Sequence, residues 1–454
     1  MRCALPDCGV PSIWATGTAP TIMRVASQAI LTQRVRAELF SGSMAGEHTL
    51  RGLTMRSALC LLLAAASAFA QAKPRARELA IPIGGTAGAL DAITDVAGVE
   101  VGFTTLISGA GRLVVGQGPV RTGVTVVHPR GRNNPDPVFG AWFTLNGNGE
   151  MTGTTWLQEG GFLEGPVGIT NTHSVGVVRD AIIAWQVRHG ALPPGGSLPV
   201  VAETYDGGLN DIDGQHVRPE HVFAALDGAQ PGPVPEGNIG GGTGMVCHGF
   251  KGGTGTSSRV VGGYTVGVLV QCNCCSRRDL GIAGVPVGLE ITDLLACSAS
   301  SDPAAGRGNA RRCADAQSPP RDDELDRADG SIIIVIATDA PLLPSQLKRV
   351  ATRASLGVGR MGGRGENGSG DIFLAFSTAN PKAAYARDSS RIVLLSNERA
   401  SALFGATVQA TEEAIVNAML GAETMTGAND RRVYALPVDR LRVAMAKYGR
   451  PLKP

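Results

Sequence analysis

Hydrophobic residues in this chain come mostly in short runs separated by glycine, asparagine and aspartate. From residue 79 onward this pattern is typical of β-strands joined by tight turns. Two runs, residues 264–273 and 331–339, are apolar at almost every position, which indicates strands covered on both faces. The stretches predicted to contain strands are residues 92–102, 122–129, 139–153, 264–273, 331–339 and 371–379.

Three other stretches change to a helical period. Residues 174–190 place their apolar side chains on one stripe and stop at Gly190. Residues 341–359 and 396–422 predict two further helices, the second opened by Ser396. Strands between helices predict an α/β layered architecture, which we expect to be one domain without internal repeats.

Residues 291–330 lose this periodicity and collect proline, serine, arginine and aspartate. That composition is typical of an exposed segment, and we expect residues 297–330 to be a mobile linker inside the domain. The linker ends at Gly330, and Ser331 begins a buried strand with no polar lead-in. This abrupt junction makes Ser331 a candidate for a chemical role.

Residues 55–72 have the layout of a secretory signal peptide, with a basic start, an apolar run and "AFA" at residues 68–70. The apolar run is too short for a permanent membrane span. We therefore expect Met55 to be the true start, residues 1–54 to be a mis-assigned upstream extension, and residues 55–70 to be removed. The alternative is a genuine long leader with an internal apolar helix. Export predicts a periplasmic or secreted protein without a membrane anchor.

The charge balance argues against one class of function. The 454 residues include 41 basic and 39 acidic side chains without a basic block, and aromatic residues make up only 4%. A nucleic-acid-binding protein needs a concentrated basic face, often with stacking aromatics, so we expect no nucleic-acid partner.

Six cysteines follow the expected cleavage point. Cys297 and Cys313 flank a polar loop, and a bridge between them would stabilise the fold by about 3 kcal/mol on the loop-entropy model. The "QCNCCS" stretch (271–276) has C-x-C-C spacing, unlike the C-x2-C pairs of structural zinc sites, so we expect buried thiols or a disulfide there and no metal. The six are Cys247, Cys272, Cys274, Cys275, Cys297 and Cys313.

A serine becomes a nucleophile only when a neighbouring group takes its proton. No serine lies in a G-x-S-x-G elbow that would pair it with a histidine. The other route uses the α-amino group of an N-terminal serine, whose pKa of about 7.7–8.0 suits a general base near neutral pH. That route requires a cut between Gly330 and Ser331. The local sequence alone favours the alternative of a serine that merely caps a strand, since Gly-Ser pairs before strands are ordinary turn chemistry.

Eight stretches, present in one order over most of residues 79–450, resemble the DmpA/BapA family of self-processing aminopeptidases (the L-aminopeptidase/D-esterase and β-peptidyl aminopeptidase group). The resemblance implies self-cleavage into an α chain (residues 71–330) and a β chain (residues 331–454) of one domain. It also implies an αββα sandwich like that of the Ntn hydrolases with different connectivity, and a homo-oligomer of αβ units. The stretches are "AITDVAGVEVG", "LNGNGEMTG", "TNTHSVGVVRDA", "ETYDGGLND", "GNIGGGTGMVCHGFKGGTGTSSR", "IAGVPVG", "DGSIIIVIATDAPLLPSQLKR" and "RGENGSGDIFLAFSTAN".

The resemblance also assigns residues. It implies that Ser331 is the nucleophile and that Ser369 and Asp371 hold its amine and hydroxyl. These two are separated by one residue before a strand, so their side chains can share one face. It further implies that the Asn273 amide stabilises the tetrahedral oxyanion.

Two more assignments come from "ETYDG". Glu203 matches the carboxylate that binds the free amine of the substrate, and Tyr205 matches a hydroxyl near the oxyanion. Without the family, Glu203 is typical of a solvated charge and Asn273 of a turn residue at a strand end. Cys274-Cys275, after Asn273, depart from the aromatic or small residue expected there, which predicts a different pocket wall.

Two motifs are discounted. The glycine-rich residues 237–256 lack the G-K-[ST] of a phosphate-binding loop, and the resemblance implies that they shape loops near the active site. "LNGNGEMTG" lacks the spacing of a calcium-binding loop. We expect no cofactor.

The leading hypothesis is an exported, self-processing serine aminopeptidase that hydrolyses short peptides, amides or esters through an acyl-enzyme on Ser331. An acyltransferase of the ornithine acetyltransferase type is the first alternative, although those use an N-terminal threonine. A non-catalytic binding protein on the same scaffold is the second. The sequence leaves open the side-chain, α/β-peptide and L/D preferences, the physiological substrate and the oligomeric number.

Overall fold

The computed structural model describes residues 73–193, 195–299, 311–315, 318–327, 330–385 and 388–453. The chain divides into two units, residues 1–70 and 71–454, and all described residues belong to the second. The predicted upstream extension and signal peptide lie outside the described residues.

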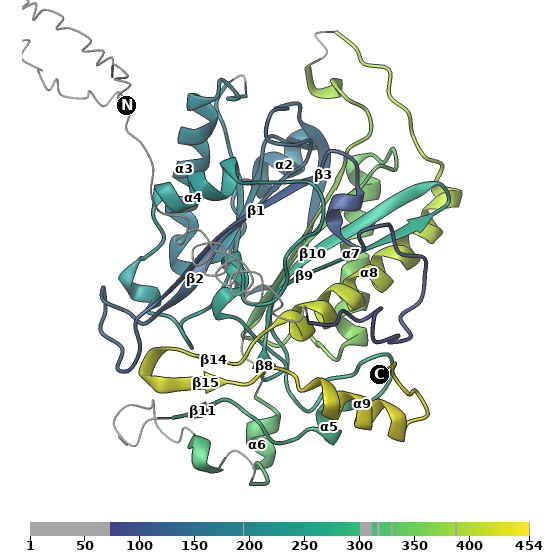
Figure 1. The fold of residues 1–454 in the computed structure, drawn as a ribbon. Helices are drawn as coiled ribbons and strands as arrows, with labels where there is room; N and C mark the ends of the chain where they lie inside the picture. The colour runs from purple at the N-terminus through teal and green to yellow at the C-terminus, as the bar shows by residue number, and fades with distance from the viewer. Residues whose placement is uncertain are drawn as a thin grey trace, which may run out of the picture. The chain divides into compact units, whose positions relative to one another are not determined.

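Two sheets form the centre of this unit (Figure 1). The first has the strand order β1 (Glu100–Ser108), β2 (Val120–His128), β5 (Val167–Asn171) and β6 (Val200–Thr204). The second has the order β4 (Phe162–Leu163), β3 (Val138–Gly147), β13 (Gly370–Ser377), β12 (Ser331–Thr338), β10 (Tyr264–Asn273) and β9 (Gly253–Val261). Two smaller sheets comprise β11 (Cys297–Ser298), β15 (Arg431–Val433) and β14 (Met425–Thr426), and β7 (Val246–Cys247) with β8 (Phe250–Lys251).

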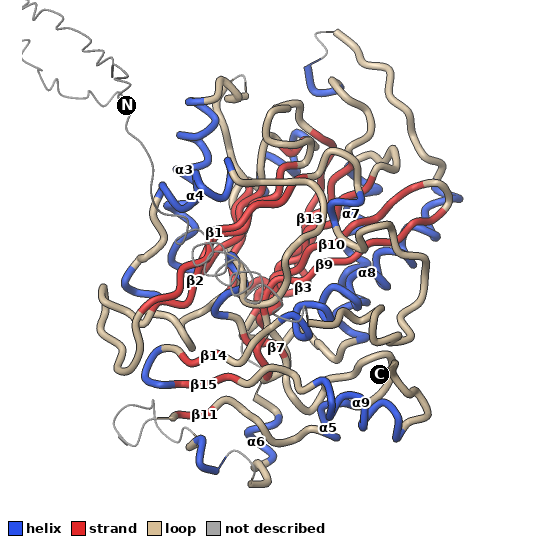
Figure 2. Tube along the Cα trace, in the orientation of Figure 1, coloured by secondary structure: helices blue, strands red, loops and turns tan. Residues whose placement is uncertain are grey.

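Helices lie on the outer faces of the two large sheets (Figures 1 and 2). The α-helices are α2 (Thr154–Gly160), α3 (Val175–Arg188), α4 (Pro219–Asp227), α5 (Val287–Glu290), α6 (Asp322–Leu325), α7 (Pro344–Arg360), α8 (Ala400–Gly421) and α9 (Val438–Lys447). Helices α7 and α8 pack on the six-stranded sheet, and α3 and α4 pack on the four-stranded sheet. None of the helices in the described ranges is both long and apolar enough to cross a bilayer.

The strand β12 shows how the layers are held together. Ile332 and Ile334 belong to the core under α7 and α8, whereas Ile333 and Val335 belong to the core between the two sheets. All eight residues of β12 are buried because successive side chains point to opposite covered faces. With its outer helices, this arrangement is an αββα sandwich, and the predicted fold class is confirmed.

Several predicted elements need correction. Residues 92–102 are not one strand: Ile93–Asp95 form a 3-10 turn, because the Asp95 carboxylate accepts hydrogen bonds from the backbone N–H groups of Leu90 and Ala92. The glycines of residues 237–256 were expected to shape loops, and the structure adds that β9 begins within this stretch. Gly255 allows this strand to pack closely, since a Cβ there would lie 2.0 Å from the carbonyl oxygen of Ala414 in α8.

Part of the predicted linker 297–330 is folded against the rest of the unit. Cys297 and Cys313 form a disulfide, as considered from the sequence. Arg278 makes ion pairs with Asp322 and Asp326 at the two ends of α6, with N–O distances of 2.7 and 2.5 Å. The mobility of the whole segment stays a prediction.

Candidate active site

A cavity of about 750 Å³ opens beside the first residue of β12. Five of the residues with a predicted role in catalysis, substrate binding or self-cleavage contribute to its walls. They are Glu203, Tyr205, Asn273, Gly330 and Ser331. Residues that are far apart in the chain therefore meet at one hollow, because the ends of β6, β10 and β12 lie together there.

Ser331 occupies a fixed position at the edge of this cavity. In the antiparallel pairing of β10 and β12 it lies opposite Asn273, so the two residues share one rung of the ladder. Its Oγ accepts a hydrogen bond of 3.0 Å from the backbone N–H of Gly370. The hydroxyl proton of Ser331 is not used by that bond and stays available for transfer.

Gly330, the residue before Ser331, lies unusually close to β10. Its φ is +136°, a backbone conformation that residues other than glycine rarely adopt. A Cβ at this position would lie 1.9 Å from the carbonyl oxygen of Asn273 and 2.9 Å from its Nδ2. Glycine is thus required for the Gly330–Ser331 peptide to lie against the Asn273 amide.

The Asn273 side chain is held by two hydrogen bonds. Its Oδ1 accepts from the backbone N–H of Val246 at 2.7 Å, and its Nδ2 donates to the backbone carbonyl of Tyr205 at 2.9 Å. A primary amide has two N–H groups, so one donor remains beside Gly330. A fixed, neutral N–H donor of this kind can stabilise a tetrahedral oxyanion.

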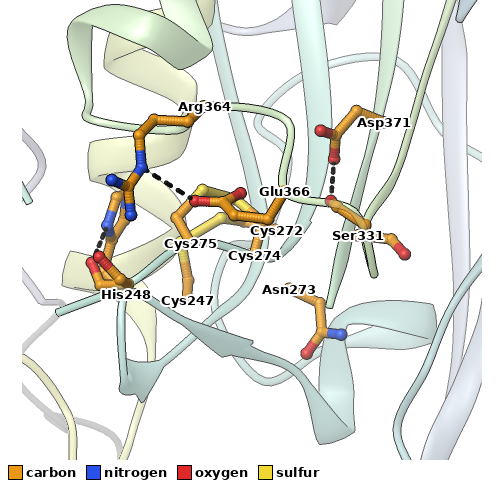
Figure 3. The surroundings of a disulfide bond; sticks show 12 residues. Cys247, His248, Cys272, Asn273, Cys274, Cys275, Ser331, Arg364, Glu366 and Asp371 are labelled. Carbon is orange, nitrogen blue, oxygen red and sulfur yellow. Dashed lines mark hydrogen bonds and ion pairs between the residues drawn. A yellow bond between two sulfur atoms is a disulfide. The ribbon is translucent and has the colours of Figure 1, made fainter. Parts of the chain in front are cut away.

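Ser369 and Asp371 lie behind Ser331, where β13 runs parallel to β12 and pairs Asp371 with Ile332. The Ser369 hydroxyl donates to the Asp371 carboxylate at 2.6 Å, and the Ile332 backbone N–H also hydrogen bonds to this carboxylate. Burial and the nearby Glu366 raise the pKa of Asp371 to about 6. Figure 3 shows Asp371 close to Ser331. No basic side chain among the described residues contributes to the pKa of this carboxylate, so in the uncut chain it is suited to receive a cation.

Glu203 lies at the end of β6 and is buried. Its carboxylate accepts hydrogen bonds from the Thr172 hydroxyl at 2.5 Å and from the Glu150 backbone N–H at 3.0 Å. Burial raises its pKa, and the Glu150 side chain adds to this effect. A Cβ at Gly149 would lie 3.2 Å from both Glu203 Oε1 and the Cα of Gly370, which places the carboxylate close to the Ser331 end of the cavity.

Tyr205 is half exposed in the cavity wall. Its hydroxyl packs over Gly207, where a Cβ would come within 2.3 Å of it. Its backbone carbonyl, rather than its phenol, makes the contact with Asn273. The predicted role of the Tyr205 hydroxyl stays a prediction.

The sulfur atoms of four buried cysteines lie together near Asn273 (Figure 3). Disulfides join Cys247 to Cys272 and Cys274 to Cys275, and Cys275 lines the cavity. The Sγ atoms of Cys247, Cys272 and Cys274 lie within 4.8 Å of one another. A metal would need thiolates, and these sulfur atoms are paired, so the donor set does not fit a metal ion in this state.

The sequence reasoning missed several groups of this site. The N–H groups of Gly370 and Val246 belong to the backbone, so no residue-type pattern identifies them. Thr172 and Glu150 lie within "TNTHS" and "LNGNGEMTG", two stretches that carried the family resemblance, but the second was weighed only as a calcium loop. Only the folded structure shows that Gly370 contacts Ser331, that Val246 contacts Asn273, and that the other two contact Glu203.

Comparisons with known proteins show the family of this chain. The sequence matches Peptidase family S58 over residues 91–433. It is 52% identical over 396 residues to beta-peptidyl aminopeptidase BapA of Sphingosinicella microcystinivorans, covering 86% of this chain and 96% of that protein. It is 48% identical over 412 residues to BapA of Sphingosinicella xenopeptidilytica, covering 88% and 97%.

Solved structures show the same fold. The L-aminopeptidase D-Ala-esterase/amidase of Ochrobactrum anthropi, described as a prototype for the serine aminopeptidases and a new variant among the Ntn hydrolase fold, superposes with a TM-score of 0.73 at 44% identity. That comparison covers 83% of this chain and 99% of the other. A Burkholderia sp. beta-aminopeptidase gives a TM-score of 0.71 at 44% identity, again covering 83% and 99%.

Proposed function

This chain belongs to peptidase family S58 and is an Ntn-type aminopeptidase, and on this premise we propose that it cuts its own Gly330–Ser331 bond to create its nucleophile. The observation that carries the proposal is the close approach of the Asn273 amide to that peptide. Both sides of the bond are held, since Ser331 is the first residue of a buried strand and Gly330 fits where a side chain would collide.

Self-cleavage proceeds in two steps. The Ser331 Oγ attacks the carbonyl carbon of Gly330, the Oγ–C bond forms, and the C–N bond breaks as the nitrogen takes a proton. The Asn273 N–H stabilises the oxyanion formed on the way. Water then hydrolyses the resulting ester, which releases the Gly330 carboxylate and leaves Ser331 with a free amine and a free hydroxyl.

The same groups then act on substrate. The free amine of Ser331 takes the hydroxyl proton as Oγ attacks the substrate carbonyl, and it passes that proton to the leaving group. The acyl-enzyme is hydrolysed by water. Asp371 holds the new ammonium through its charge, and Ser369 fixes the orientation of Asp371, as supported by the 2.6 Å bond between them.

Glu203 binds the ammonium group of the substrate. Burial and the neighbouring Glu150 side chain raise its pKa, and a bound ammonium would lower that pKa again. The substrates we propose first are short peptides and amides whose N-terminal residue is a β-amino acid, because two relatives with 52% and 48% identity are named beta-peptidyl aminopeptidases.

Export and assembly are part of this proposal. The signal-peptide layout of residues 55–72 supports a periplasmic or secreted enzyme that begins after Ala70. We also expect the processed αβ units to form a homo-oligomer. N-terminal sequencing of the native protein tests the first point, and an intact Met1 would contradict it.

Denaturing electrophoresis with N-terminal sequencing tests self-cleavage. The wild-type chain should give two fragments, one beginning at Ser331, and hydrolyse β-amino-acid p-nitroanilides. Ser331→Ala should stay whole and inactive, whereas Ser331→Cys should retain some cleavage because it keeps a nucleophile. Ser377→Ala, which removes an equally buried hydroxyl at the far end of β13, is the control and should process normally. A wild-type chain that stays whole while active would overturn the proposal.

A further inference from the structure

Three cysteine sulfur atoms gather beside the end of β10 that carries Asn273 (Figure 3). The Sγ atoms of Cys247, Cys272 and Cys274 lie within 4.8 Å of one another, and we call these three residues the sulfur cluster. All three are buried in the core under α7 and α8, whereas Asn273 lines the cavity. Cys272 and Cys274 are the two sequence neighbours of Asn273, so alternate positions of the chain place the sulfur atoms on one side and the amide on the other.

Backbone hydrogen bonds hold the sulfur cluster together independently of its disulfides. Cys272 belongs to β10, which is paired with β9 on one side and with β12 on the other. The N–H of His248, the residue after Cys247, donates to the Cys274 carbonyl at 2.7 Å. Reduction of the two disulfides would therefore leave three thiols close together on a scaffold that the sheet keeps in place.

The spacing of these sulfur atoms suits a tetrahedral metal ion with thiolate ligands. Zinc–thiolate bonds are about 2.3 Å long, so thiolates bound to one tetrahedral ion lie roughly 3.8 Å apart. Sulfur atoms that are within 4.8 Å now need to approach by at most about 1 Å, and the bonded pair separates on reduction. Thiolates select soft cations such as zinc or copper(I), so the ligand type agrees with the geometry.

Cys275 gives this cluster a connection to the substrate cavity. It lines the cavity and is bonded to Cys274. A small reductant can therefore reach the Cys274–Cys275 bond from the cavity, and a metal ion has the same entry path. A plausible metal site needs such a path as well as suitable ligands.

We propose that, in the thiol state, Cys247, Cys272 and Cys274 bind one thiophilic divalent cation of the zinc class, and that this ion lowers turnover by displacing Asn273. The expectation that this stretch holds no metal then applies to the disulfide state alone. The link to turnover rests on the proposed oxyanion role of Asn273, whereas the metal site itself does not depend on it.

The reduction and the binding step are both chemically simple. A phosphine gives two electrons to each disulfide and takes an oxygen atom from water, and the two protons of that water go to the sulfur atoms. Metal binding then replaces the proton of each thiol by a metal–sulfur bond and releases those protons. Because Cys272 and Cys274 flank Asn273, a sulfur shift of about 1 Å is passed to its amide, and a misplacement of that size can slow a reaction about 100-fold.

Cadmium titration of the reduced enzyme tests the site, because cadmium–thiolate bonds absorb in the near ultraviolet. Enzyme that has been reduced with a phosphine and desalted without oxygen should show this band and bind about one Cd²⁺ per chain. The disulfide-bonded enzyme should show no band. As the band saturates, kcat for a p-nitroanilide should fall at least about tenfold from that of the reduced, metal-free enzyme, and a chelator should restore it. Cd²⁺ should leave turnover of the disulfide-bonded enzyme unchanged, which separates this site from binding at Glu203.

The matched control removes the other cysteine pair of the unit. A double variant, Cys297→Ser with Cys313→Ser, should keep the cadmium band after reduction, whereas Cys274→Ser should lose it. No band in the reduced wild type, or an equal band in Cys274→Ser, would overturn the metal site. If that variant does not fold, the reduced and disulfide-bonded wild types still decide the question.

Two outcomes separate the parts of this inference. A saturated band with unchanged turnover would overturn the link to Asn273. Failure of the proposed self-cleavage would be seen differently, as an active chain that stays whole on denaturing gels, and it would leave the cadmium band unaffected.

Discussion

Replacing Gly330 by alanine should block self-cleavage while leaving the nucleophile itself in place. The added Cβ would lie 1.9 Å from the carbonyl oxygen of Asn273, and real contacts of this kind stay beyond about 3 Å. The Asn273 oxygen belongs to the backbone of β10, which is paired with β12 over eight residues, so it cannot move aside independently. The Gly330 carbonyl must move instead.

The size of the effect follows from that displacement. The Cβ and the carbonyl oxygen must separate by roughly 1 Å, and a misplacement of about 1 Å at a reacting centre can slow a reaction about 100-fold. The φ of +136° adds strain of about 1–3 kcal/mol for any residue with a Cβ. Gly330→Ala should therefore process about 100-fold more slowly than the wild type.

The assay is a time course of freshly translated chain on denaturing gels, with thermal unfolding measured in parallel to show that the precursor is folded. Gly368→Ala is the matched control, because Gly368 also lines the cavity but a Cβ there would meet no atom within 4 Å. It should process at close to the wild-type rate. Wild-type processing of Gly330→Ala, or equal slowing of Gly368→Ala, would refute the steric argument.

Three further predictions concern charge and cross-linking. The pKa of Asp371 is about 6 in the uncut chain, and the new ammonium of Ser331 should lower it after cleavage because it stabilises the ionised carboxylate. Substrate turnover should therefore fall about tenfold per pH unit only well below pH 6, and Asp371→Asn should lose this limb of the pH–rate profile; a limb at or above pH 6 in the wild type would contradict this. Glu203→Gln should raise the KM for substrates with a free amine at least about tenfold while the precursor still processes normally on gels, and impaired processing would argue against a role limited to substrate binding. Cys313→Ser should lower the free energy of unfolding by about 3 kcal/mol in denaturant titrations, and an unchanged midpoint would mean that the Cys297 disulfide does not restrain the unfolded chain.

The strands and helices that the sequence predicted well are those whose neighbours on both faces are apolar. Residues 264–273 and β10 coincide, and β12 begins at Ser331 as predicted, because continuous burial leaves little choice of register. The elements that were predicted incorrectly are those whose backbone conformation depends on local hydrogen bonds or on close packing. The 3-10 turn at Ile93–Asp95 depends on the Asp95 carboxylate, and β9 depends on glycine contacts with α8.

The sequence predicted only part of the candidate site. Ser331, Ser369 and Asp371 could be proposed because a family resemblance pointed to them, and their spacing fits one face of a strand. The backbone donors of Gly370 and Val246 could not be proposed from the sequence, since every residue other than proline has such a group. Only the fold selects which N–H groups reach Ser331 and Asn273.

The sequence by itself determined the layered α/β character of this protein and the abrupt junction at Gly330–Ser331, because short-range patterns of apolar and small residues are sufficient for both. The tertiary structure alone decided that Asn273 lies opposite Ser331 and that Glu203 lines the same cavity as both. Those groups are separated by tens to hundreds of residues in the chain. Their proximity depends on strand pairing and on the packing of the two large sheets, which no local pattern encodes.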